Sequence, residues 1–262
     1  MPMTYRGTTA LITGASAGLG VEFARQWAAR GADLVLVARR ADRLEELAAE
    51  LAAAHGVRAH VVTADLSLPG AAADLRTELD KRGLAVQTLI NNAGFGAHGP
   101  FASSDADRVG EMIRLNVTAV AELSRAFLPD LLADGRGALV NVASAAGYQP
   151  TPAMAVYGAS KAFVLHFTEA LAHENRHADL RVLAVSPGPV GTEFFDVVGT
   201  RKAAVGRMAT AEQVVATARR ALEGRRTPPS VVVGWATRLS VLASAAAPRR
   251  LALAVAGRAL GA

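Results

Sequence analysis

The sequence predicts an α/β fold, a single doubly wound Rossmann-type domain with a seven-stranded parallel sheet flanked by helices. Apolar runs rich in Val, Leu and Ile alternate with longer helical segments along nearly the whole chain. Strands that are apolar on both faces and separated by helices are typical of a parallel sheet covered on both sides. A length of 262 residues, 51% of them hydrophobic, suits one such domain with a large core.

The order of the expected elements is strand then helix, repeated from the N-terminus. The expected strands are Thr8–Thr13, Leu34–Ala38, Arg58–Ala64, Thr88–Asn91, Ala138–Ala143, Arg181–Ser186 and Ser230–Gly234. The expected helices are Leu19–Arg30, Ala41–His55, Ala71–Arg82, Arg108–Leu132, Ala153–His177 and Ala211–Glu223. In such a sheet, ligands bind beyond the carboxyl ends of the strands, so the residues that follow each strand carry the functional information.

Composition excludes several classes of site. The chain has no cysteine, which rules out disulfides, thiolate metal ligands and a cysteine nucleophile and fits a cytoplasmic location. Its formal charge of +5 comes from arginines spread along the chain, without the block of like charges that a nucleic-acid-binding arm requires. Residues 1–8 contain no apolar signal core, and no run reaches the roughly 18 apolar residues of a membrane span. We therefore expect no nucleic-acid partner and no membrane span.

A glycine-rich turn follows the first strand. Gly14, Ser16, Gly18, Leu19 and Gly20 stand between this strand and the next helix. Glycines let the backbone approach a pyrophosphate, and the helix N-terminus offers it free N–H groups and a partial positive charge. These five residues are therefore candidates for dinucleotide binding.

The same turn also reads as G-x-S-x-G, the pattern of a hydrolase nucleophile elbow at Ser16. That interpretation needs an earlier loop for the oxyanion hole, yet only one strand precedes Ser16. A serine hydrolase is kept as an alternative, because the pattern alone does not decide.

An arginine follows the second strand. A carboxylate at this point selects the ribose hydroxyls of NAD, whereas Arg39 suits the 2′-phosphate of NADP. Asp33 begins the strand, so it should lie at the opposite edge of the sheet. We therefore expect NADP, with NADPH preferred over NADH.

The next two strand ends also carry candidate residues. After the third strand, Asp65 and the neighbouring Leu66 suit the adenine side, although Asp65 would equally be the N-cap of a short turn. After the fourth strand, Asn92, Ala93 and Gly94 are small enough for a flat ligand to approach closely, and an ordinary turn is the alternative.

Tyr157 and Lys161 are spaced to share one face of a helix. A phenol with an ordinary pKa of about 10 is a poor base at neutral pH. We expect the lysine ammonium to lower the pKa of Tyr157 and so prepare it for proton transfer. Ser144, after the fifth strand, can hydrogen-bond a carbonyl oxygen that is being reduced.

Taken together in this order and spacing, these residues resemble the short-chain dehydrogenase/reductase family from Arg6 to Gly234. The matching motifs are Thr13-Gly14-x-x-x-Gly18-x-Gly20, Asn91-Asn92-Ala93-Gly94, Asn116, Ser144, Tyr157-x-x-x-Lys161 and Pro187-Gly188. The resemblance implies that Tyr157 is the general acid/base, that Lys161 assists it and binds the nicotinamide ribose, that Ser144 positions the carbonyl and that Asn116 holds a proton relay. It also places Pro187, Gly188, Val190 and Thr192 beside the nicotinamide.

The resemblance implies an NADP(H)-dependent oxidoreductase that interconverts a carbonyl and a secondary alcohol. A looser similarity to broad carbonyl and 3-oxoacyl reductases favours reduction of a lipophilic ketone or 3-oxoacyl substrate. Family members pair through the helices that hold Asn116 and Tyr157, so we expect a homodimer or homotetramer. A nucleotide-binding regulator or scaffold without turnover is the remaining alternative.

The substrate loop is expected at Thr192–Met208, with an apolar first half and a basic second half. Its apolar residues are Phe194, Phe195, Val197 and Val198, and its basic residues are Arg201, Lys202 and Arg207. Phe95, Gln149, Pro150 and Met154 are expected to line the same pocket. The pattern suits a lipophilic carbonyl substrate with an anionic end, although the phenylalanines would equally cover the core.

We interpret residues 1–235 as the dinucleotide-binding and catalytic domain and 236–262 as an amphipathic C-terminal extension. This extension alternates apolar patches with Arg238, Arg249, Arg250 and Arg258. A subunit interface, peripheral contact with an anionic membrane and an ordinary surface extension all remain open. His173-Glu174-x-x-His177 matches a zinc-protease signature, but no third ligand is evident, so no metal is expected.

Overall fold

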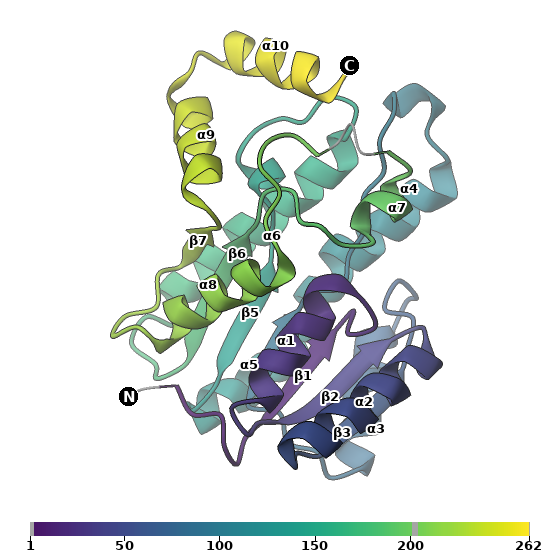
Figure 1. Ribbon diagram of the computed structural model, residues 1–262, viewed down its shortest axis with the longest axis vertical. Helices are drawn as coiled ribbons and strands as arrows, with labels where there is room; N and C mark the ends of the chain where they lie inside the picture. Colours follow the sequence, from purple (N-terminus) through teal and green to yellow (C-terminus); the bar gives the residue numbers. More distant parts are fainter. Residues whose placement is uncertain (1–2, 201–203, 262) are drawn as a thin grey trace.

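The computed structural model describes residues 3–200 and 204–261 and contains the expected seven-stranded parallel sheet (Figure 1). The strands are β1 (Thr9–Thr13), β2 (Asp33–Ala38), β3 (Ala59–Thr63), β4 (Thr88–Asn91), β5 (Ala138–Val142), β6 (Arg181–Ser186) and β7 (Ser230–Val232). Their order is β3-β2-β1-β4-β5-β6-β7, and every neighbouring pair is parallel. The direction of winding changes between β1 and β4, which is the point where ligands bind in such sheets.

Helices cover both faces of the sheet, and short turns join several of them. The helices are α1 (Gly18–Ala28), α2 (Ala41–His55), α3 (Ala71–Lys81), α4 (Ala106–Ile113), α5 (Ala119–Asp134), α6 (Ala155–Glu174), α7 (Phe194–Val198), α8 (Ala211–Glu223), α9 (Trp235–Ala246) and α10 (Arg249–Leu260). The turns are the 3₁₀ segments η1 (Phe101–Ser103) and η3 (Ala145–Tyr148) and the π-helical segment η2 (Arg114–Thr118).

Two apolar layers sandwich the sheet because successive strand residues point to opposite faces. Ile12 of β1 packs with Phe23 and Trp27 of α1 in the layer that α2 and α8 complete. Its neighbour Leu11 packs in the other layer with Phe127 of α5 and residues of α3. All of these named side chains are at most 2% exposed, so the sheet is dry on both faces.

The expected single helix Arg108–Leu132 is wrong in one respect, since α4 and α5 are separated by the π-helical turn η2. Asn116 lies in this turn and is fully buried. Its side chain donates to the carbonyl of Phe95 and accepts from the Phe95 N–H. Such turns are commonly found at functional sites, and here the turn aims one amide inward.

The helix expected over Ala153–His177 is shorter at both ends in the structure. Ala153 has a left-handed φ of 60°, which no residue of an α-helix adopts, and α6 starts after it. The helix ends at Glu174, so His177 lies beyond it. His173 and His177 therefore do not share a helix face, as a zinc-protease signature requires.

We predict that Gly20→Ala destabilises the protein by about 1–3 kcal/mol, the usual cost of overpacking. A Cβ on Gly20 would overlap the Gly14 carbonyl and crowd Ala15, both of them backbone groups that cannot yield. Urea denaturation of the purified variant measures the change in unfolding free energy.

Gly191→Ala is the matched control, because a Cβ on Gly191 meets nothing within 4 Å. Its stability should stay within about 0.5 kcal/mol of the parent. Equal effects of the two substitutions would contradict the close packing of β1 against α1.

Candidate active site

A cavity of about 640 Å³ lies at the carboxyl ends of the strands. With two exceptions, every residue that the sequence analysis proposed for catalysis or cofactor binding lines it. The exceptions are Gly20, which packs against the Gly14 carbonyl, and Asn116, which lies fully buried behind the cavity wall. Residues that follow successive strands therefore meet in one cavity, although they come from nearly the whole chain.

The glycine turn has the geometry of an anion cradle. Gly14 and Gly18 have φ values of 66° and 53°, a conformation that residues with a Cβ rarely adopt. Helix α1 begins at Gly18, and its N-cap Ala17 makes no side-chain capping bond. The Gly20 N–H bonds the Ala17 carbonyl, so the N–H groups of Gly18 and Leu19 are the ones left for a ligand, and a pyrophosphate fits them.

Thr13 joins the ends of β1 and β4, a role that the sequence analysis did not assign. Its hydroxyl accepts hydrogen bonds from the backbone N–H groups of Asn92 (2.9 Å) and Ala93 (3.0 Å). The Asn92 amide in return donates to the Thr13 carbonyl at 2.9 Å. These bonds hold the glycine turn and the Asn92–Gly94 segment together at the change in winding direction.

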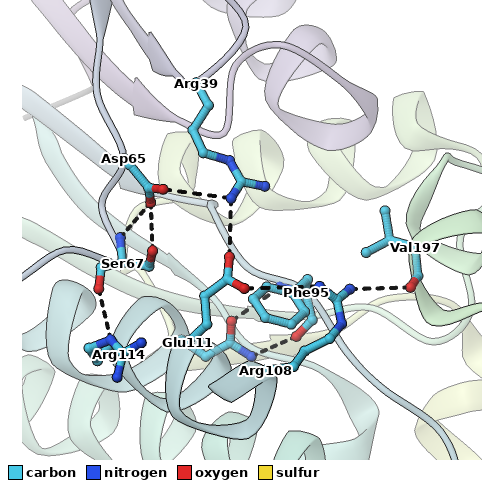
Figure 2. Close-up of polar contacts among 9 residues, drawn as sticks. Arg39, Asp65, Ser67, Phe95, Arg108, Glu111, Arg114 and Val197 are labelled. Carbon is cyan, nitrogen blue, oxygen red and sulfur yellow. Dashed lines mark hydrogen bonds and ion pairs between the residues drawn. The ribbon is translucent and has the colours of Figure 1, made fainter. Parts of the chain in front are cut away.

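Arg39 lies at the cavity edge between two carboxylates (Figure 2). Its guanidinium is 3.1 Å from Glu111 and 3.7 Å from Asp65. Burial disfavours ionisation of Asp65, but hydrogen bonds from Ser67 and the charge of Arg39 outweigh it and lower the pKa of this carboxyl. Asp65 thus stays an ionised acceptor at neutral pH.

Asp33 lies at the opposite end of β2, as expected. Both of its oxygens accept hydrogen bonds from Arg58, one from the backbone N–H and the other from the guanidinium. Asp33 therefore has no part in the cavity, and Arg39 is the charged residue that follows β2.

Arg40 also lines the cavity, although the sequence analysis named only its neighbour. Its guanidinium donates to the Ser16 hydroxyl at 3.2 Å and to the Ser16 carbonyl at 3.3 Å. It also pairs with Glu193 before α7. Arg40 therefore connects the glycine turn with the substrate loop.

Tyr157 and Lys161 lie on one face of α6 and are both buried. The Lys161 ammonium donates to the Val142 carbonyl at 2.7 Å and lies 6.0 Å from the centre of the Tyr157 ring. Burial raises the pKa of Tyr157 to about 12, against a smaller opposing effect of a hydrogen bond with Ser144. The expected lowering of the Tyr157 pKa by Lys161 is thus wrong, because desolvation of the phenol dominates and raises this pKa.

Burial acts on Lys161 in the opposite sense, since the charged form of a lysine is the protonated one. It lowers the pKa of Lys161 to about 8. The same dry pocket therefore favours a neutral phenol and weakens the proton affinity of the amine beside it.

Asn116 connects the cavity loop with α6. Besides its two bonds to Phe95, its amide donates to the Ser160 hydroxyl at 3.1 Å. Ser160 in turn donates to the Tyr157 carbonyl at 2.7 Å. In the structure Asn116 thus acts on Tyr157 through Ser160 and the helix backbone, which is a positioning role.

The substrate end of the cavity is apolar. The Tyr157 ring packs 5.4 Å from that of Phe194 on α7. Four further apolar side chains form a cluster with Tyr157, namely Phe95, Met112, Met154 and Leu260. Leu260, in the last turn of α10, is more than a hundred residues from Tyr157 in the chain and had no local signal in the sequence.

The predicted pocket residues are largely in place. Phe95, Gln149, Met154, Phe194, Phe195, Val197 and Arg207 line the cavity. Pro150 is exposed and is not part of the lining, and Val198 is buried outside it. Arg201 and Lys202 lie outside the described residues.

Arg108 connects this end with the Arg39 cluster (Figure 2). It lies over the Phe95 ring at 4.5 Å, donates to the Val197 carbonyl at 3.4 Å and is 4.0 Å from Glu111. Glu111 thus faces an arginine from each end of the cavity.

The family model for short chain dehydrogenases matches residues 8–203. The chain belongs to the short-chain dehydrogenase family. The matched residues include the glycine turn, Ser144, Tyr157 and Lys161. The part of the chain that matches this oxidoreductase family therefore supplies these residues of the cavity.

Relatives within the family include two reductases. The chain is 41% identical to sulfoacetaldehyde reductase 2 of Chromohalobacter salexigens over 187 residues, which are 70% of this chain and 73% of that enzyme. It is 34% identical to a very-long-chain 3-oxoacyl-CoA reductase of Anas platyrhynchos over 73% of this chain, but the match spans only 62% of that enzyme.

Solved structures of short-chain dehydrogenases share the fold. One from Sphingobium yanoikuyae, in complex with NADPH, is 34% identical with a TM-score of 0.80 and covers 95% of each chain. A 7β-hydroxysteroid dehydrogenase structure is 29% identical with a TM-score of 0.86, covering 98% of this chain and 100% of that one.

We predict that removing the buried amine makes unfolding less pH-dependent. Below about pH 8, Lys161 is charged in the folded and unfolded states, so the cost of its burial is fully present. As the pH rises toward the ordinary pKa of 10.5, the folded protein holds the neutral amine and this cost disappears. The parent should therefore gain about 2 kcal/mol of stability relative to Lys161→Met between pH 7 and pH 10.

Urea denaturation of both proteins at the two pH values measures this difference. The hydrogen bond to Val142 is stronger from the ammonium than from the neutral amine, and this difference is already part of the Lys161 pKa that the measurement reports. Lys81→Met, at the exposed end of α3, corrects for the removal of a positive charge. The stability of the parent minus that of Lys161→Met should rise with pH. A value that stays constant or falls as the pH rises would contradict a lowered Lys161 pKa.

Proposed function

We propose that this short-chain dehydrogenase is an NADP(H)-dependent reductase of a lipophilic ketone or 3-oxoacyl substrate. Tyr157 is the proton donor, Ser144 holds the carbonyl oxygen and Lys161 supports the phenol and the cofactor ribose. The observation that carries the proposal is the buried Tyr157 at the junction of an apolar pocket and a glycine-rich anion cradle.

The protonation state of Tyr157 suits the reductive direction. With a pKa of about 12 the phenol holds its proton at neutral pH, which is the state that a general acid needs. The nicotinamide, when bound, supplies the hydride to the carbonyl carbon. Tyr157 gives its proton to the carbonyl oxygen, while the Ser144 hydroxyl orients that oxygen.

Two arginines support NADP as the cofactor. Arg39 and Arg40 follow β2, where the adenosine ribose of a dinucleotide lies in such folds. Glu111 and Asp65 hold the guanidinium of Arg39 at the cavity edge, and a phosphate would compete with them for it. The NADPH complex of the similar Sphingobium enzyme agrees with this choice.

The lining of the substrate end supports a lipophilic substrate. Phe95, Met154, Phe194 and Leu260 surround Tyr157, and apolar walls of this kind favour alkyl or ring systems over sugars. Relatives named as 3-oxoacyl-CoA reductases point to the same class. Arg207 at the cavity and Arg108 above Phe95 suit an anionic end of the substrate.

A hydrolase at Ser16 is disfavoured by the geometry. The Ser16 hydroxyl accepts a hydrogen bond from Arg40, and an arginine cannot serve as its general base. A scaffold without turnover would not need the buried Tyr157–Lys161 pair, whose desolvation is costly. A homo-oligomer and a cytoplasmic location stay predictions; none of the helices within residues 3–200 and 204–261 is long and apolar enough to cross a membrane.

Tyr157→Phe should lower kcat for ketone reduction by at least about a hundredfold, because it removes the proton donor. Binding of NADPH, followed by nicotinamide fluorescence, should change by less than about threefold, since the ring and its packing remain. Undiminished turnover would exclude Tyr157 as the proton donor. A parent protein that binds NADPH but reduces no ketone in a broad panel would favour the scaffold alternative.

Arg39→Ala should weaken NADPH binding about ten- to a hundredfold, the worth of a charge-assisted contact. Binding of NADH, which lacks the 2′-phosphate, should barely change. Fluorescence titration with both nucleotides measures the ratio. Arg58→Ala is the matched control, because Arg58 pairs with Asp33 at the far edge of the sheet; a parallel loss of NADPH and NADH affinity would refute phosphate recognition by Arg39.

A further inference from the structure

Helices α9 and α10 carry a bare apolar surface. In Figure 1, α9 follows β7 and runs up the left side of the molecule, and α10 crosses its top. Five large apolar side chains on one side of these helices are between 56% and 72% exposed: Trp235, Leu239, Leu242, Leu251 and Val255. We call these residues the outer face.

The opposite side of the same helices covers the cavity. Thr237 and Val241 of α9 and Ala256 and Leu260 of α10 line it. The Leu260 carbonyl accepts a hydrogen bond from the His98 ring at 2.8 Å, which fastens the end of α10 over the substrate pocket. The helices thus form a cover whose inner side touches the cavity, while the outer face has no partner within the described chain.

The charge of the chain is unevenly distributed. The arginines are spread along the sequence, but all 23 acidic residues precede residue 224. The same part of the chain holds 22 of the 28 basic residues, so its charges nearly cancel. Residues 224–262 hold six arginines and no Asp or Glu, so the positive formal charge of the protein originates in this segment. Four of the six, Arg238, Arg249, Arg250 and Arg258, lie on α9 and α10 and are exposed.

Two of these arginines are unfavourably placed for the helix itself. Arg249 and Arg250 open α10, where the helix dipole is positive and where acidic residues are preferred. The N-cap Pro248 makes no side-chain capping bond to the first N–H groups. An external anion beside this turn would satisfy both the guanidinium groups and the free N–H groups.

We propose that the α9–α10 cover is a docking surface for an anionic lipid membrane. Apolar side chains bordered by arginines are the composition of helices that lie in the interface of a bilayer. Each helix has 12 residues and is about 18 Å long, too short for the roughly 30 Å of a hydrocarbon core. The helices therefore lie on the membrane, with the outer face among the acyl chains and the arginines at the phosphates.

A second copy of the chain fits this surface less well. A two-fold interface places the same patch of each copy against the other. Arginines would then meet arginines, and residues 224–262 contain no carboxylate side chain to pair with them. Lipid phosphates supply the missing anions at any position along the two helices.

Docking in this orientation would bring the cover of the substrate pocket to the bilayer surface. A lipophilic ketone dissolved in the membrane would reach the cavity without crossing water. This consequence rests on the proposed function, whereas the docking surface itself does not, and the test below uses no catalytic readout.

The two tryptophans make the test specific. Trp27 is 1% exposed in the core and Trp235 is 72% exposed at the start of α9. Adding vesicles of phosphatidylcholine with about a third phosphatidylglycerol to the full-length protein should shift Trp fluorescence to shorter wavelength and sediment the protein. Trp235→Phe should lose the spectral shift but still sediment.

The arginines and the outer face are then tested separately. Arg249→Gln/Arg250→Gln should lower the partition coefficient about thirtyfold, from a contribution of about fivefold per arginine. Leu239→Ser/Leu242→Ser should abolish the shift in the presence of Arg249 and Arg250. Arg58→Gln, an exposed arginine at the far edge of the sheet, should bind as the parent does.

Three results would overturn the proposal. The first is no binding to the anionic vesicles, and the second is equal binding to pure phosphatidylcholine, which needs no arginine. The third is a Trp235 emission that is at short wavelength without lipid and moves to long wavelength on dilution. In that case Leu239→Ser/Leu242→Ser would also lower the molecular mass of the protein in solution. That result would assign the outer face to contact between copies of the chain.

Discussion

The fully buried amide of Asn116 holds the active site together. It uses both ends of its side chain, bonding the backbone of Phe95 after β4 and the hydroxyl of Ser160 on α6. Three separate segments thereby meet at one residue, and the helix that carries Tyr157 and Lys161 is fixed against the end of the sheet. A buried amide is stable only when its hydrogen bonds are made, so the π-helical turn η2 that aims Asn116 inward is required by the site.

Much of this architecture could be predicted from the sequence because the causes are local. Strands such as Leu34–Val37 are apolar on both faces, and only a sheet covered twice can bury them. The residues that follow such strands must then converge at one edge, which explains why Gly14, Arg39 and Ser144 were placed in one cavity without knowledge of any contact.

Features that depend on distant partners could not be predicted. The π-helical turn exists because Asn116 bonds Phe95, 21 positions away. Leu260 reaches Tyr157 only because α10 folds back over the cavity. The predicted lowering of the Tyr157 pKa was wrong for the same reason. The spacing to Lys161 shows a neighbouring charge, but it does not show how completely Met112, Met154 and Leu260 exclude water.

The cover and the chemistry are linked through that exclusion of water. Burial raises the pKa of Tyr157 and lowers that of Lys161, and the end of α10 contributes to the burial through Leu260. Displacing the cover would hydrate the phenol and the amine and move both pKa values back toward their ordinary range. The cover therefore helps to set the proton affinity of both groups, because Leu260 at the end of α10 is part of the apolar cluster around Tyr157.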